Sequence, residues 1–193
     1  MFRPGLLDAR RVALAGPAGG GSPAREIDRA VLDRLAALGA RVDVIDPETL
    51  FDEEATTAWA QQRAPLDALV FLAGEPFGAG GADRLQATLE AAWRAVRGAQ
   101  PCLREGGRLV FVAPAAGAAR PHGEAARVGL ENLARTLSVE WARLGVTAVA
   151  IAPGAATAAD DVGDLVAYLL SPAGGYFSGC RLSLGEVAPA AAG

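Results

Sequence analysis

The sequence predicts an α/β protein built on a doubly wound parallel sheet, and three observations lead to this fold class. Short apolar runs alternate with amphipathic helical runs along the chain. Several runs are apolar at every position, as expected of strands covered on both faces. The chain has 193 residues, of which 51% are hydrophobic, enough for one full core. Together these observations favour a single Rossmann-like domain over residues 1–187, with a flexible tail at 188–193.

The strands are predicted from short apolar stretches bounded by glycine, proline or charged residues. Crossover connections between such strands are expected to be right-handed. In chain order, the predicted strands are Arg11–Gly16, Arg41–Asp46, Ala68–Gly74, Arg108–Ala113, Val146–Ala152 and Cys180–Leu184.

The helices are predicted from apolar residues at helical spacing. In the first, Ser22 is a suitable N-cap, Pro23 suits the first helical position, and the helix should end near Gly39. Its apolar stripe is Ile27, Val31, Leu35 and Leu38. The later helices are predicted at Asp52–Gln62, Leu85–Leu103, Glu124–Leu144 and Val162–Leu170.

Composition excludes several functions. All 18 basic residues are arginine, so the chain has no lysine amine that could form a Schiff base or bind phosphate as a P-loop lysine does. The net charge of −4, without basic clusters, argues against nucleic acid binding. No window is long and apolar enough to span a membrane, and no secretory signal is visible. With two cysteines and no metal-ligand spacing, we expect a cytoplasmic protein without metal.

The stretch GLENLARTLSVEWARLGVTAVAIAPG at Gly129–Gly154 resembles the short-chain dehydrogenase/reductase family, from just after its Tyr-x-x-x-Lys motif to the Pro-Gly that follows its sixth strand. Further similar stretches are Leu66–Gly74, Leu103–Pro114 and Asp161–Gly179, so the resemblance covers nearly the whole chain. It implies a Rossmann fold and NAD(P)-dependent oxidoreductase ancestry.

The resemblance also implies where an Asn–Ser–Tyr–Lys catalytic set would lie. The Asn position falls near Thr88 and the Ser position on Pro114 or Ala113. The Tyr position falls on Gly123 and the Lys position on Arg127. All four catalytic side chains are therefore missing, and arginine is a poor substitute for lysine because it stays protonated and has a planar head.

The family's cofactor loop is altered as well. The stretch after the first strand contains the vestigial glycines Gly16, Gly19 and Gly21, of which Gly21 matches a glycine of the family motif. Pro17 and Pro23 stand where the family has its first and third glycines. Asp46 lies where a carboxylate would bind the ribose of NAD, and Gly74 closes the third predicted strand. We expect no cofactor. The alternative is that these vestigial residues still bind NAD(P).

Two segments are shorter than in the family. The stretch between Asp46 and Leu66 has little room for the usual helix and third strand. After Pro153-Gly154 the chain runs almost directly into the last helix, where the family has its substrate lid. The expected fold is therefore a reduced version of the family's.

The two long helices keep broad apolar faces. In the family, such helices pair with those of a second subunit. We predict an interface formed by Leu89, Trp93, Val96, Leu133, Leu137 and Trp141. The partner would be an active member of the family or a second copy, in a dimer or tetramer. The alternative is that these faces pack only on their own sheet.

Three functions stay open at this point. The first is a catalytically inactive structural or regulatory subunit that pairs with an active paralogue. The second is an NAD(P)-dependent oxidoreductase with a non-standard site, in which Arg127, Thr88 or His122 takes an unfamiliar role. The third is a small-ligand sensor that uses the cleft, or a self-associating homodimer.

Overall fold

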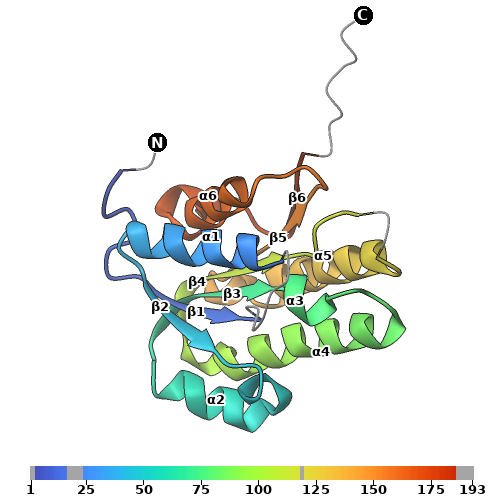
Figure 1. Ribbon diagram of the computed structural model, residues 1–193. Coiled ribbons are helices and arrows are strands. Elements are labelled where there is room, and N and C mark those ends of the chain that lie inside the picture. The colour runs from blue at the N-terminus through green and yellow to red at the C-terminus, as the bar shows by residue number, and fades with distance from the viewer. Residues whose placement is uncertain (1–2, 17–23, 118–119, 186–193) are drawn as a thin grey trace, which may run out of the picture.

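The sheet of this protein has six parallel strands and lies between two layers of helices (Figure 1). The computed structural model describes residues 3–16, 24–117 and 120–185. The strands are β1 Arg11–Ala15, β2 Arg41–Ile45, β3 Leu66–Leu72, β4 Leu103–Val112, β5 Thr147–Pro153 and β6 Cys180–Leu184. The helices are α1 Ala24–Ala37, α2 Glu53–Gln61, α3 Gly74–Phe77, α4 Ala82–Ala99, α5 Gly123–Glu140 and α6 Ala159–Leu170. The predicted fold class is confirmed.

The strand order is β2-β1-β3-β4-β5-β6, and every neighbouring pair is parallel. Between β2 and β3 the chain forms only a 3₁₀ turn at Thr49–Phe51 and helix α2. The predicted loss of a strand in this region is therefore confirmed, and β2 becomes an edge of the sheet. The link from β5 to α6 is also short, since α6 begins at Ala159.

Each face of the sheet builds its own core. In β1, Val12 and Leu14 belong to the cluster under α1 and α6, whereas Ala13 and Ala15 belong to the cluster under α4 and α5. This alternation follows from the two-residue period of a strand. Figure 1 shows α1 and α6 together over one face and α2, α4 and α5 over the other.

Several element boundaries differ from the prediction. Strand β4 begins at Leu103 rather than Arg108, because Leu103 pairs with Leu66 ahead of a bulge. Helix α4 ends at Ala99, and α5 ends at Glu140 and is followed by a 3₁₀ turn. The short helix α3 was not predicted, because its sequence Gly-Glu-Pro-Phe reads as a loop. Ser22 and Pro23, the predicted start of α1, lie outside the described residues.

Candidate functional site

The carboxyl ends of the parallel strands meet at one edge of the sheet, where open α/β sheets bind their ligands. The strand order reverses between β1 and β3, so the crevice at this point is the candidate site. Gly16 directly follows β1, and Gly74 begins α3 directly after β3. The predicted residues Gly19 and Gly21 lie outside the described part of the chain.

Gly16 is required here for a structural reason. It is buried, its φ is +79°, and a Cβ at this position would collide with the backbone carbonyl of Leu72. Only glycine tolerates both conditions. The tight turn after β1 therefore explains Gly16 whether or not a nucleotide binds.

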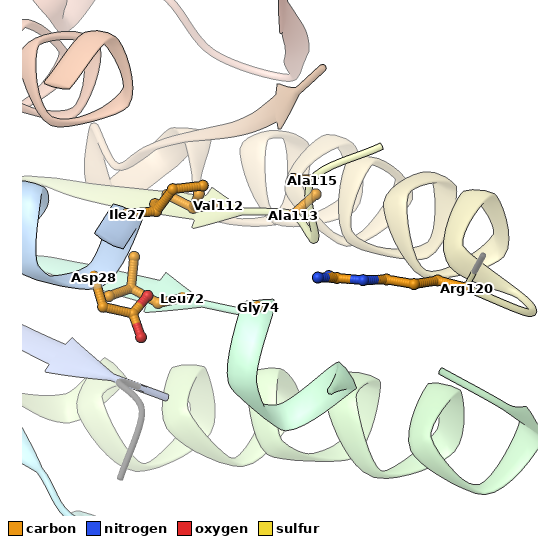
Figure 2. Close-up of a pocket in the computed structure, with 8 residues that line it drawn as sticks. All are labelled: Ile27, Asp28, Leu72, Gly74, Val112, Ala113, Ala115 and Arg120. Atoms are coloured by element: carbon orange, nitrogen blue, oxygen red, sulfur yellow. The ribbon is translucent and has the colours of Figure 1, made fainter. Parts of the chain in front are cut away.

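A small cavity of about 70 Å³ opens at this edge. Figure 2 shows the Arg120 side chain extended from the loop before α5, with its guanidinium directed toward Gly74. Asp28 of α1 lies at the opposite side of the cavity, near Leu72. Asp28 is 5% exposed, so the cavity has a buried carboxylate at one end and a guanidinium entering from the other.

Neither Asp28 nor Arg120 was identified from the sequence, although each carries a signal. Asp28 lies three residues before Val31 and seven before Leu35, so helical spacing places it on the apolar stripe. Arg120 is the only basic residue between Ala113 and Glu124 other than a histidine. A charged residue on an apolar helical stripe and an isolated arginine in a loop of small residues are the sequence signals that point to these two positions.

Arg127, at the family's lysine position, is 2% exposed and bonded to the ends of two strands. Its Nη1 donates to the carbonyl oxygens of Pro114 (3.0 Å) and Pro153 (2.6 Å). Its Nε donates to Glu124 (3.1 Å), which also accepts from Arg181 of β6 (3.2 Å). Arg127 thus fastens α5 to the carboxyl ends of β4 and β5.

The structure also places the residues that the sequence assigns to the other three catalytic positions, and it places His122. Gly123 is the first residue of α5 and has no side chain. The Thr88 hydroxyl is buried and donates to the carbonyl of Arg84 within α4 (2.7 Å). Pro114 contributes only the carbonyl that Arg127 binds. His122 is exposed and has a left-handed backbone conformation, with φ +62°.

Asp46 has a local role in the structure. Thr49 donates its backbone N–H to one carboxylate oxygen (2.9 Å) and its hydroxyl to the other (2.7 Å). These hydrogen bonds, led by that of the Thr49 hydroxyl, lower the pKa of Asp46 from its usual value. Asp46 therefore holds the turn at Thr49–Phe51, and its predicted ribose binding stays a prediction.

The predicted interface residues divide into two groups. Val96 and Leu137 are fully buried in the chain's own core, which corrects their assignment to an exposed face. Leu89, Leu133 and Trp141 are partly buried against the same core. Trp93 is 44% exposed, and the prediction missed the exposed Val128 and Val139 of α5. The apolar residues are spaced along α4 and α5 as predicted, but part of each apolar stripe packs against the chain's own sheet.

Among the described residues, no group of three or more His, Cys, Asp and Glu side chains could hold a metal ion. Within the same residues, every helix is too short or too polar to cross a bilayer.

Comparison with known proteins identifies the architecture. No family model matches the chain, and no curated protein matches its sequence. Solved structures do match. A short-chain dehydrogenase/reductase from Serratia marcescens is 24% identical over 93% of this chain and 97% of that chain, with a TM-score of 0.73. The citronellol catabolism dehydrogenase of Pseudomonas aeruginosa is 23% identical over 95% and 96%, with a TM-score of 0.72. This chain has the short-chain dehydrogenase/reductase fold.

A third similar structure is BdcA in complex with NADPH, 19% identical over 93% of this chain and 94% of that chain, with a TM-score of 0.71. That structure contains a nicotinamide cofactor, so the spaces at the same edge of this sheet are compared with the size of such a ligand. The cavity of about 70 Å³ at Gly74 is too small for a dinucleotide, whereas a larger groove of about 460 Å³ opens beside Gly16 and is also lined by Pro47 and Arg84.

Proposed function

We propose that this chain is a catalytically inactive protein of the short-chain dehydrogenase/reductase fold that serves as a structural or regulatory subunit. It would pair with an active paralogue through α4 and α5. The proposal rests chiefly on the burial and the hydrogen bonds of Arg127. Its guanidinium is buried and hydrogen-bonded to two strand-end carbonyls, so it cannot take the part of a mobile lysine beside a phenol.

The missing phenol supports the same conclusion. Carbonyl reduction requires a general acid within hydrogen-bond reach of the substrate oxygen. Gly123 offers none, and Thr88 already donates its hydroxyl inside α4. Arg120 is the remaining cation at the cavity among the described residues, and a guanidinium does not release its proton at physiological pH.

The subunit role is supported by what α4 and α5 leave exposed. Trp93 is 44% exposed, Val128 50% and Val139 77%, and all three are apolar. The two helices also pack closely on each other, because a Cβ at Gly129 would lie 2.8 Å from Leu89 Cδ2. A pair of rigid neighbouring helices with exposed apolar side chains suits a helix-on-helix interface.

The test of pairing is co-expression with short-chain dehydrogenase/reductases encoded near this gene, followed by native mass spectrometry. We expect a mixed oligomer that the Val128→Glu variant abolishes and the Ala36→Glu variant keeps, since Ala36 is exposed on α1 of the opposite layer. A wild-type protein that stays monomeric with every such partner would contradict the proposal.

The test of inactivity is separate. NADH and NADPH are titrated calorimetrically, and oxidation of either is followed with a panel of ketones. We expect neither binding nor turnover by the isolated chain. Turnover by protein freed of contaminating reductases would overturn the inactive assignment, whatever its oligomeric state.

A second candidate is an NAD(P)-dependent oxidoreductase with a non-standard site. It is favoured by the direction of Arg120 into the cavity and by the NADPH complex of the similar protein BdcA. On this hypothesis, NADPH binds to the wild type and is lost in Arg120→Ala. The matched control is Arg29→Ala, whose side chain is 84% exposed on α1.

A further inference from the structure

The amino edge of the sheet, opposite the candidate site, carries an excess of arginine. Arg10, Arg104 and Arg108 gather around the carboxylate of Asp67, whose side chain is only 4% exposed. Arg10 Nη1 lies 3.1 Å from Asp67 Oδ1, and Arg104 Nη1 lies 3.7 Å from the same oxygen. The other oxygen accepts the backbone N–H of Arg11 at 2.8 Å.

A bulge in β4 produces this arrangement. Leu66 pairs with Leu103 and Ala68 pairs with Arg108, so residues 104–107 of β4 face Asp67 alone. Gly106 makes the turn possible with a φ of +74°. Bulges redirect side chains at sheet edges, and this one brings Arg104 and Arg108 to the same aspartate.

Arg108 has the least compensated charge of the three. Its Nη1 donates to the carbonyl oxygens of Gly106 (2.6 Å) and Gly107 (3.4 Å), and no described carboxylate forms an ion pair with it. Burial and, secondarily, the nearby charge of Arg10 lower the pKa of Arg108. Arg10 and Arg104 thus share the carboxylate of Asp67, and Arg108 lies beside them without an ion pair to a described carboxylate.

The neighbouring strands repeat the pattern. Asp43 of β2 lies within 4 Å of the guanidiniums of Arg11, Arg41 and Arg63, at 2.7, 3.8 and 3.7 Å. In these ion pairs, five guanidiniums share the carboxylates of Asp67 and Asp43, although acidic residues outnumber arginines over the whole chain. Charge is therefore separated within the molecule, and this edge attracts anions.

A groove beside Arg104 offers space for a ligand. Its volume is about 270 Å³, compared with about 10 Å³ for the space between Arg10, Asp67 and Arg108, which holds no more than a water molecule. The groove is lined by Gln100, Leu103, Arg104, Glu105, Trp141, Arg143, Leu144 and Val146. Glu105 is the single carboxylate in this lining, against two guanidiniums.

We propose that this groove binds a small organic anion bearing carboxylate or phosphate groups, held by Arg104 and Arg143 over the ring of Trp141. Guanidiniums bind both oxyanions in forked geometry, and the groove is large enough for the carbon body of such a ligand. The groove lies at the opposite end of the strands from the candidate cavity. Because Trp141 is also a predicted interface residue, the proposal is tested on the isolated chain.

The test is titration of the ¹⁵N-labelled full chain with citrate and, separately, with inorganic phosphate, at constant ionic strength. The backbone amides of Gly106 and Gly107 and the indole N–H resonance of Trp141 report on the groove. We expect saturable changes with at least one of the two anions. Saturation by phosphate alone identifies a phosphate group as the recognised chemistry, and saturation by citrate alone identifies carboxylates.

Arg104→Gln is the informative variant, because its side chain is 53% exposed and its loss should not unfold the protein. Losing a charged hydrogen bond should weaken binding about tenfold or more. Arg29→Gln, on α1, is the matched control and should bind as the wild type does. Linear, non-saturating responses to both anions, or equal weakening by both variants, would overturn the proposal.

Discussion

At the carboxyl edge of the sheet, Arg127 is 2% exposed and donates to two carbonyl oxygens and a carboxylate of its own chain. At the amino edge, Arg104 is 53% exposed and shares the single carboxylate of Asp67 with Arg10. A buried guanidinium must be satisfied internally, because desolvation of an unpaired charge is costly. An exposed one keeps donors for other molecules. The same residue type is therefore structural at one edge and available for binding at the other.

The largest effect should come from Arg127→Met. This change leaves the carbonyls of Pro114 and Pro153 without their donor in a buried environment. We expect a loss of about 3 kcal/mol in the free energy of unfolding, measured with urea. Arg29→Met, at an exposed position, should cost less than about 0.5 kcal/mol. An equally small loss for Arg127→Met would mean that the arginines of the two environments are equivalent.

The next effect concerns two glycines at the carboxyl edge. Gly16→Ala adds a Cβ against the Leu72 carbonyl at positive φ and should destabilise the fold by about 2 kcal/mol or more. Gly123→Ala is its control, because a Cβ there meets nothing closer than 3.7 Å. It should be neutral or stabilising in thermal denaturation. The reverse ranking would show that Gly16 is not needed for the turn.

Asp67→Asn tests the amino edge. The variant removes the carboxylate shared by Arg10 and Arg104 and should cost about 1–2 kcal/mol of unfolding free energy. It should also tighten citrate or phosphate binding in the groove, because the local positive charge rises. Denaturation with and without anion measures both effects. Weaker anion binding in this variant would show that Asp67 positions the arginines and that its charge is secondary.

The smallest effect should come from Asp46→Asn and depend on pH. Because the folded-state pKa of Asp46 lies below its ordinary value of 3.8, ionised Asp46 stabilises the fold above that pH. This contribution is lost as the pH falls below 3.8 and through the folded-state pKa. The Asn variant should therefore show a shallower loss of stability on acidification, in unfolding curves recorded from pH 6 to pH 2. Identical acid profiles would mean that Thr49 holds the turn without the charge.

Sequence patterns predicted the repetitive parts of the molecule well, because apolar periodicity reports directly on burial. Strand β6 was placed with both ends correct at Cys180–Leu184. The missing strand between Asp46 and Leu66 was predicted because this segment is shorter than in the family that the sequence resembles. The predicted start of strand β4 was wrong because its pairing with β3 is irregular there. Strand β4 begins at Leu103 because of a bulge, and the local pattern of apolar residues does not predict this bulge.

The site was less predictable, because side-chain direction depends on tertiary contacts. The resemblance assigned Arg127 to the family's lysine position, but only the fold shows that the carbonyls of Pro114 and Pro153 accept hydrogen bonds from its guanidinium. Arg120 was passed over because a loop residue gives no periodic signal. Val96 and Leu137 were misassigned because a helical stripe does not reveal which of its residues the sheet covers.

The shortened segment before β3 has a consequence for behaviour at high concentration. With no strand beyond it, β2 presents unpaired backbone groups along one side of the sheet, and such borders invite strand-by-strand polymerisation. The ion pairs of Asp43 with Arg11, Arg41 and Arg63 line this border. Charged side chains on an edge strand disfavour such pairing, and Arg41, whose side chain is 70% exposed, supplies one on β2.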